Sequence, residues 1–390
     1  MEEADELLAR RARAQWLTER PAATAAEVAA HTAGVQAQEP MGASLAVRAR
    51  SATATGHGVD TAAAAERSIV CTWLMRGTLH LVAAEDVRWM LGLFGVRNAA
   101  AGVRRRRELG LDEQTCARAL DEIPRVLAAE SPLSRARLIE RLVERGVAVN
   151  PQGQAPAHLM AYAAAHGLIC RGPAVDGTEP GYVLLEEWVP AAPPLDADAA
   201  LAQLTRRYLG AYGPAGPADL AAWSGLPVGV ARRGFAMIGD DLAAVGPEHA
   251  VLRGTPEPRP AARGAGSGAA GAAGAAGAAG AAGAAGAAGV RLLGRFDSYL
   301  LGYRNRDLAL PPRHATRIQA GGGIIHPAVL VDGRVVGKWR MRRDSGRVDV
   351  VVEPFEELHG GLPPALEAEV ADLARFLGLA SGTLSVERGP

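Results

Sequence analysis

Two glutamines separated by one alanine are the residues whose types and spacing first raise a chemical question. Gln36 and Gln38 lie in the segment GVQAQEP (residues 34–40) and are followed by Glu39 and Pro40. A carboxamide neither takes up nor releases a proton near neutral pH, but its oxygen accepts hydrogen bonds and its NH2 group donates them. The pair could therefore hold a water or a cation, or it could only bridge a helix–loop junction.

The conformation of this segment decides whether the two amides can act together. In an extended chain, positions two apart point to the same side, whereas on a helix they diverge. Pro40 biases Glu39 towards an extended conformation. We therefore expect Gln36 and Gln38 to present their amides on one side of an extended segment.

The elements around this segment form a recurring unit. Residues 115–189 show helical periodicity in CARALDEIPRVLAA, SRARLIERLVERG and GQAPAHLMAYAAAHG, followed by two short apolar strands in LICRGPAVDGTEPGYVLL. Three helices followed by a hairpin is the order of a winged helix, a helix-turn-helix variant with a β wing. Residues 196–253 repeat this order with a degraded wing. Residues 1–95 follow it too, with hairpin strands IVCTWLM and TLHLV across Arg76-Gly77.

A low-complexity segment divides the chain. Residues 254–289 are Pro, Gly and Ala with a few arginines and end in repeated Ala-Ala-Gly, which predicts a flexible linker. The expected fold class is α+β, with three tandem winged-helix domains and a C-terminal β-hairpin-rich element. We expect winged helices at 1–112, 113–195 and 196–253, the linker at 254–289, and the β-rich element with a closing helix at 290–390.

The C-terminal part contains a possible phosphate-binding strand. Its sequence AVLVDGRVVGKWRMRRDSGRVDVVVEPF predicts two hairpins, with turns at Asp332-Gly333 and at residues 344–346. Alternation puts several cations on one face of the middle strand and apolar residues on the other. The cations that we consider for DNA binding are Arg340, Arg342 and the adjacent Arg343. The alternative is a solvated outer face.

Composition limits the class of protein. There are 42 basic and 42 acidic residues, so there is no global basic signature of a nucleic-acid binder. The three cysteines are far apart and odd in number, which predicts neither a disulfide framework nor a metal site. The N-terminal segment is an amphipathic charged helix and not a signal peptide, and no apolar run could span a bilayer. We expect a cytoplasmic protein without a cofactor or metal.

Six motifs of the sequence, taken in order, resemble those of a known protein family. The order VQAQEP, CTWLMRGTLHLV, RRYLGAYGPAGPADLAAWSGL, FDSYLLGYRNR, GGGI and VDGRVVGKW is similar to that of the bacterial AlkZ-like DNA glycosylases, over nearly the whole chain except the linker. The resemblance implies three tandem winged helices in a C-shaped arrangement with a C-terminal β-rich element. It also implies a catalytic signature of glutamine, aliphatic residue and glutamine, which Gln36 and Gln38 match. Glu39 stands where the family has aspartate.

The resemblance implies a reaction in which the two amides could take part. An N7-alkylated guanine already carries a positive charge, so it leaves without protonation by a strong acid. The protein then has to stabilise an oxocarbenium-like sugar and place a water, which carboxamides can do. Arg76 and His80 on the first wing could contact phosphate or the lesion, although a histidine between apolar residues is more often a core residue. Asp297 and Tyr303 match a family motif and could order the cleft or only fix the join after the linker.

The resemblance therefore implies a monofunctional glycosylase. Its substrate would be bulky or crosslinked N7-alkylguanine in duplex DNA, its role self-resistance to a DNA-alkylating natural product, and its state a monomer that binds DNA but no membrane. One rival is a winged-helix transcriptional regulator without catalysis. Another is a housekeeping alkylpurine glycosylase.

Overall fold

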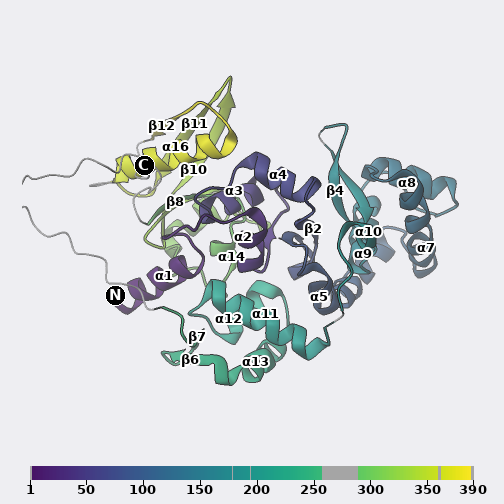
Figure 1. The fold of residues 1–390 in the computed structure, drawn as a ribbon, viewed down its shortest axis with the longest axis horizontal. Coiled ribbons are helices and arrows are strands. Elements are labelled where there is room, and N and C mark those ends of the chain that lie inside the picture. The colour runs from purple at the N-terminus through teal and green to yellow at the C-terminus, as the bar shows by residue number, and fades with distance from the viewer. Residues whose placement is uncertain (1, 178, 194, 257–288, 359–361, 388–390) are drawn as a thin grey trace, which may run out of the picture.

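The chain folds as a mixed α+β protein. A computed structural model describes residues 2–177, 179–193, 195–256, 289–358 and 362–387. Helices dominate up to residue 253, and a sheet covered by one helix forms the C-terminal part (Figure 1). The predicted linker lies outside the described residues over 257–288. Among the described residues, no helix has the length and apolar character needed to cross a membrane.

The N-terminal elements agree with those predicted from periodicity. A capping box starts the second helix, because the Thr24 side chain accepts from Glu27 N while the Glu27 carboxylate accepts from Thr24 N. The elements are α1 (Glu2–Ala14), α2 (Ala25–His31), β1 (Val35–Gln36), α3 (Pro40–Arg50), α4 (Gly56–Ala64), β2 (Ile69–Trp73), the 3-10 turn η1 (Met75–Gly77) and β3 (Leu79–Ala83). Two further helices, α5 (Val87–Ala101) and α6 (Val103–Glu108), lead out of this unit.

Two further units each have three helices followed by a hairpin. The first of these units consists of α7 (Glu113–Glu130), α8 (Arg135–Glu144), α9 (Ala155–Ala165), β4 (Ile169–Val175) and β5 (Glu179–Leu184), with α10 (Leu185–Trp188) after it. The next consists of α11 (Ala197–Tyr212), α12 (Pro217–Ser224), α13 (Val228–Met237), the 3-10 turn η2 (Gly239–Asp241), β6 (Leu242–Val245) and β7 (His249–Leu252). In Figure 1, α7 and α8 lie at the opposite end of the molecule from the C-terminal sheet.

The first two hairpins join into one sheet. Its strand order is β1-β3-β2-β4-β5, and β2 meets β4 antiparallel at Cys71 and Arg171. The two-residue strand β1 forms the edge of this sheet on β3. Neither the joining of the hairpins nor the short edge strand was predicted from the sequence.

The C-terminal sheet has five strands in the order β12-β11-β10-β9-β8. Leu366, Val370 and Leu373 of the covering helix pack against its inner face, where Trp339 and Val350 are buried. The predicted hairpins and closing helix are confirmed, and two flanking strands add to them. The elements are β8 (Val290–Leu293), α14 (Ser298–Leu301), η3 (Pro312–His314), α15 (Ala315–Ile318), β9 (Ala328–Val331), β10 (Arg334–Asp344), β11 (Arg347–Pro354), α16 (Leu362–Leu377) and β12 (Ser381–Val386).

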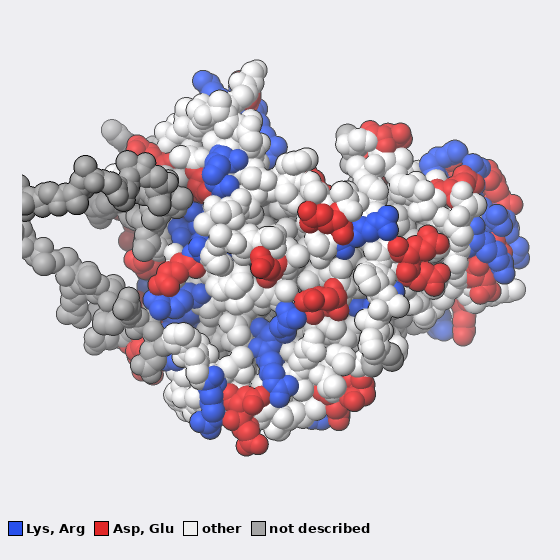
Figure 2. All heavy atoms as spheres, in the orientation of Figure 1, with Lys and Arg blue, Asp and Glu red and all other residues white. Residues whose placement is uncertain are grey.

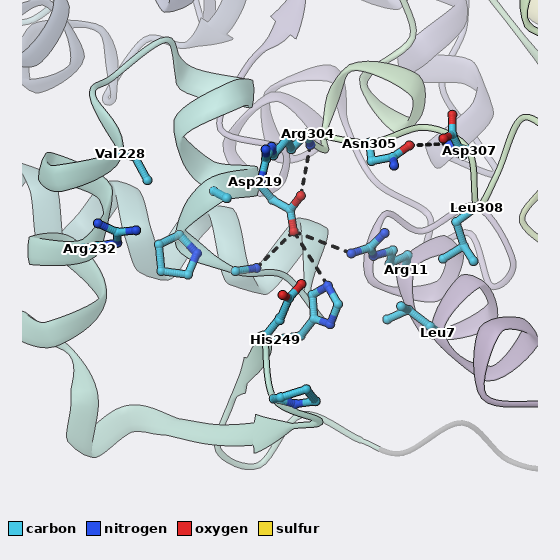
Figure 3. A pocket seen from close by; sticks show the side chains of 15 residues that line it. Leu7, Arg11, Asp219, Val228, Arg232, His249, Arg304, Asn305, Asp307 and Leu308 are labelled. Atoms are coloured by element: carbon cyan, nitrogen blue, oxygen red, sulfur yellow. Dashed lines mark hydrogen bonds and ion pairs between the residues drawn. The ribbon is translucent and has the colours of Figure 1, made fainter. Parts of the chain in front are cut away.

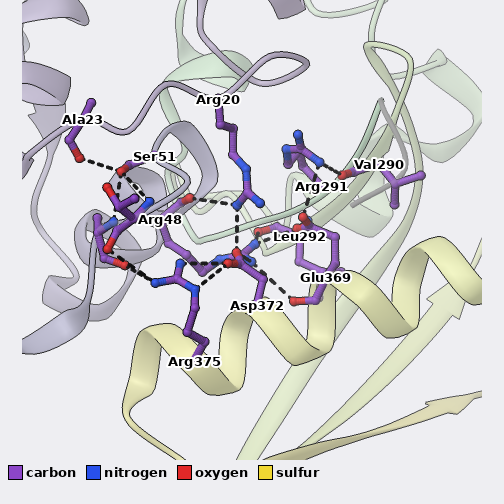
Figure 4. A network of polar contacts seen from close by, with 12 residues as sticks. Arg20, Ala23, Arg48, Ser51, Val290, Arg291, Leu292, Glu369, Asp372 and Arg375 are labelled. Atoms are coloured by element: carbon purple, nitrogen blue, oxygen red, sulfur yellow. Dashed lines mark hydrogen bonds and ion pairs between the residues drawn. The ribbon is translucent and has the colours of Figure 1, made fainter. Parts of the chain in front are cut away.

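Buried arginines tie α3 to the C-terminal part. Arg48 is fully buried and donates to Glu369 Oε2 at 2.8 Å and to Asp372 Oδ2 at 2.8 Å, both on α16 (Figure 4). Burial alone would raise the pKa of Asp372, but Arg48 and Arg20 outweigh it and hold that pKa below its usual value. A buried charge persists only when it is paired, so this network fixes α3 against α16.

Candidate active site

Gln36 lies on the edge strand β1, and Gln38 follows it in the loop before α3. Gln36 pairs in register with His80 of β3, so the two residues are direct cross-strand neighbours. The chain enters β1 through Gly34, whose φ is 106°. A Cβ at Gly34 would lie 2.8 Å from Cγ1 of Val82, so only glycine fits this turn.

The two amides face each other. Gln36 Nε2 donates to Gln38 Oε1 over 3.0 Å, so the two side chains meet as expected, although the strand ends at Gln36 and Gln38 lies in a bend. Gln36 is 7% exposed, whereas Gln38 is exposed to solvent. The hydrogen bonds among the described residues leave the NH2 group of Gln38 unpaired, so this group is open to solvent.

The carboxylate of Glu39 is hydrogen-bonded to backbone N–H groups at the start of α3. It is the N-cap of α3 with extended angles (φ −120°, ψ 109°), as expected of the residue before Pro40. Its carboxylate accepts from Met41 N at 3.2 Å and from Gly42 N at 2.5 Å. The neighbouring ionisable group therefore has a structural partner at each oxygen.

Arg76 reaches the amide pair from the turn between β2 and β3. Its Nη2 donates to Gln36 Oε1 at 2.8 Å, its only side-chain hydrogen bond to a described residue. Part of Arg76 is open to solvent, yet its surroundings displace enough water to lower its pKa, and nearby Arg306 lowers that pKa further. A guanidinium stays protonated in proteins, so the bond to Gln36 is charge-assisted.

His80 lies inside the sheet and not on its surface. It is 2% exposed, and burial together with the charge of Arg76 lowers its pKa to about 3. Its Nδ1 lies 2.9 Å from the carbonyl oxygen of Thr78, which can only accept, so Nδ1 carries the proton of a neutral ring. The contact with DNA that we considered for His80 is therefore inconsistent with its burial, and the core alternative describes it.

Asp297 and Tyr303 belong to one buried hydrogen-bond network that does not contact Gln36 or Gln38. Asp297 caps α14 and pairs with Arg50 through two bonds of 2.8 and 2.9 Å, and both residues are fully buried. Gln15 accepts from Arg50 at 2.6 Å and donates to the Tyr303 hydroxyl at 3.4 Å. Tyr303 in turn donates to the carbonyl of Tyr212 at 3.1 Å. These contacts join α1, α3 and the segment after the linker.

On the basic stripe of β10, carboxylates neutralise Arg340 but pair only loosely with the exposed Arg342. Alternation over residues 338–342 is as predicted, with Trp339 buried and Arg340 exposed. Arg340 pairs with Glu353 and with Glu387, and Arg342 lies 3.4 Å from the Asp344 carboxylate. Arg343 instead points to α3, where its Nη2 lies 3.1 Å from Sδ of Met41. Of the three arginines, Arg343 therefore lies beside the α3 N-terminus that follows Gln38.

Surface charges elsewhere are mixed. On the face shown in Figure 2, acidic and basic side chains alternate, most densely at the end formed by α7 and α8. That face therefore presents no continuous basic patch among the described residues. A phosphate backbone is better matched by a surface on which cations are not paired with carboxylates.

A cavity of about 1120 Å³ lies at the N-terminus of α12, but Gln36 and Gln38 do not line it. Its centre is Asp219, which accepts from Gly216 N and Arg304 N, while Arg11 lies 3.7 Å away (Figure 3). The Asp219 carboxylate is thus satisfied by two backbone N–H groups and a nearby guanidinium. The cavity therefore does not compete with the amide pair as the reactive site.

Comparison with known proteins shows similarity along nearly the whole chain. The family described as DNA glycosylase AlkZ-like matches residues 29–376. An interstrand DNA cross-link repair glycosylase of Streptomyces sahachiroi is 29% identical over 385 residues, 96% of this chain and 96% of the relative. The solved structure of Streptomyces sahachiroi DNA glycosylase AlkZ matches with a TM-score of 0.77 and 27% identity, covering 98% of this chain and 99% of that chain. The similarity thus includes the C-terminal sheet as well as the helical units.

Proposed function

Because the chain belongs to the DNA glycosylase AlkZ-like family, it is a DNA glycosylase, and we propose that it hydrolyses the N-glycosidic bond of bulky or crosslinked N7-alkylguanine in duplex DNA. The cross-link repair named for the Streptomyces relative supports such a substrate. The observation that carries the proposal is the bond between Gln36 and Gln38, which puts two non-titrating amides side by side with one of them exposed.

The amide pair suits the departure of a cationic base. N7 alkylation places a positive charge on the guanine, so the base leaves without a general acid. Gln38 Oε1 has one lone pair left after it accepts from Gln36, and this lone pair can accept a hydrogen bond from the attacking water. The same oxygen carries partial negative charge towards a sugar that becomes cationic, which lowers the barrier electrostatically. The free NH2 group of Gln38 can hold a phosphate oxygen.

The architecture that we propose for DNA binding is three tandem winged helices in a C-shaped arrangement around the duplex. An open cleft would accept a crosslinked base, which is tied to the opposite strand and cannot rotate fully into a tight pocket. Arg342 and Arg343 would contact phosphates from the β10–β11 hairpin. We further propose that the protein acts as a cytoplasmic monomer in self-resistance to a DNA-alkylating natural product.

Substitution of the glutamines tests this proposal. Gln36→Ala and Gln38→Ala should each slow single-turnover excision from a duplex with one bulky N7-alkylguanine by roughly 10- to 1,000-fold. Binding to the same duplex, measured by fluorescence anisotropy, should stay nearly unchanged. The double variant should lose less than the product of the two single losses, because both amides serve one water and one cation. Gln114→Ala, at an exposed glutamine in the first turn of α7, is the matched control.

Glu39 is the rival catalyst in this experiment. Glu39→Gln keeps an oxygen for the α3 cap and should retain most of the excision rate. If Glu39→Gln abolishes excision while the glutamine variants keep full rates, the carboxylate is the catalyst and the amide mechanism is wrong. Full activity in all three variants would remove this segment from the chemistry altogether.

A further inference from the structure

Arg76 adopts a backbone conformation that glycine adopts more readily than a residue with a side chain. Its φ is 56°, in the left-handed region that residues with a Cβ rarely adopt. Surrounding groups hold this turn, since Asn98 Nδ2 donates to Leu74 O at 2.7 Å. On the other side, the C-cap residue that follows α12 packs against it, because a Cβ at Gly225 would lie 3.0 Å from Cγ of Arg76. The turn is therefore over-determined, and it directs one guanidinium at Gln36.

The chemistry of arginine fixes which way the Gln36 amide points. A guanidinium has five donors and no acceptor, so only the carbonyl oxygen of Gln36 can face it. The NH2 group of Gln36 must then point the other way, towards Gln38. Only the oxygen of Gln38 can accept from it, and the NH2 group of Gln38 is consequently turned outwards. One cation thus sets the orientation of two side chains that could each otherwise adopt either of two flipped states.

We propose that Arg76 is a positioning residue for base excision, which sets the polarity of the Gln36–Gln38 pair. The inference rests on the proposed function of the two glutamines. The charge-assisted bond to the Gln36 oxygen makes the Gln36 NH2 group a stronger donor, and this strengthens the bond to Gln38 in turn. Arg76 therefore acts on the reaction through Gln36, and its effect disappears when Gln36 is removed.

A double-mutant cycle separates this role from a phosphate contact. The single-turnover rate at saturating protein is measured with a duplex that carries one bulky N7-alkylguanine. Arg76→Ala and Arg76→Gln should lose roughly 10-fold, because neither side chain forces the amide orientation. Arg76→Lys is still a pure donor with a positive charge and should recover part of the rate. In the Gln36→Ala background, Arg76→Ala should cause no further loss.

Arg67 supplies a matched control. It has the same φ of 56°, is exposed, and makes one side-chain hydrogen bond within the described part of the chain, to the carbonyl of Glu187 at 3.3 Å. Arg67→Ala should leave the excision rate unchanged. It shows what the loss of one arginine from a left-handed position does to folding, which the thermal unfolding midpoint reports for every variant.

Two results would overturn the inference. If Arg76→Ala lowers the slope of log affinity on log salt by about 0.9 and leaves the saturated rate intact, Arg76 is a phosphate contact. If Arg76→Ala lowers the excision rate of the Gln36→Ala protein by the same factor as that of the wild type, Arg76 acts independently of the amides. Normal rates in the Gln36→Ala and Gln38→Ala variants would instead refute the proposed function itself, whereas slow glutamine variants with a fast Arg76→Ala would refute only the positioning role.

Discussion

Replacing Asp297 by asparagine should destabilise the protein strongly while leaving its chemistry intact. The side chain keeps its size and one oxygen for the cap on Tyr299 N, at 2.8 Å, but it loses the charge opposite Arg50. Both partners of this pair are completely buried. Breaking such a pair leaves an uncompensated charge in the interior and costs about 3–5 kcal/mol of unfolding free energy. That is a large fraction of the roughly 5–15 kcal/mol by which native proteins are stable.

Denaturant unfolding followed by circular dichroism measures this loss. Removing both charges together, as Arg50→Met with Asp297→Leu, should restore much of the stability, because a pair of apolar side chains leaves no charge unpaired. The exposed pair Arg313–Glu356 is the control, and Glu356→Gln should leave the midpoint unchanged, because exposed ion pairs contribute little.

Excision assays on the same variant decide what Asp297 does. Arg50 lies in the last turn of α3, whereas Gln38 precedes its first turn, so the pair anchors the helix at the end remote from the amides. Excision per folded molecule at low temperature should therefore stay near the wild-type rate. A loss of stability below about 1 kcal/mol would refute the argument from buried charge. A large loss of excision in fully folded protein would show instead that Asp297 orders the cleft.

Three further predictions concern salt and pH. The double variant Arg342→Ala/Arg343→Ala should reduce the slope of log affinity on log salt by about 1.8. Arg340→Ala should leave the slope unchanged, since two carboxylates already neutralise that side chain. If a binding titration gives the double variant the wild-type slope, the β10–β11 hairpin lies outside the DNA interface. Because the glutamines do not titrate and burial and Arg76 lower the pKa of His80 to about 3, the excision rate should be flat between about pH 6 and 8. His80 takes up a proton at its ordinary pKa of 6.5 in the unfolded chain, but only near pH 3 in the folded protein. The unfolding free energy should therefore fall as the pH drops from 6.5 towards 3. His80→Gln should make this fall smaller.

The sequence predicted the local elements well because their signals are local. The helices from α7 to α13 follow apolar periodicity, and the hairpin of β2 and β3 follows from two apolar runs around Arg76-Gly77. The extended conformation of Glu39 followed from Pro40, and the strand at Gln36 agrees with the expected extended segment, although Gln38 lies in a bend. Each of these depends on neighbours a few residues away.

What the sequence did not predict depends on residues far apart. Arg48 and Arg50 lie in a short helix of small and apolar residues, and nothing local shows that their partners stand 247 to 324 positions later. The neutralisation of Arg340 requires Glu353 and Glu387 from two other strands. One signal was available, because two arginines two positions apart on an otherwise buried helix cannot both face solvent. Such residues call for a buried acidic partner elsewhere in the chain.

The amide pair also answers an electrostatic difficulty of this reaction. A sugar that becomes cationic would be repelled by an arginine in direct contact, by about 4 kcal/mol at about 4 Å and an effective dielectric constant of about 20. In the proposed mechanism, two amides would separate the guanidinium of Arg76 from the sugar by about 8 Å or more, which would reduce the repulsion to about 2 kcal/mol. The cation can thus orient Gln36 and Gln38 while neutral groups face the reacting carbon. A site built this way has no proton to give to the leaving base, so it favours substrates whose base already carries a positive charge.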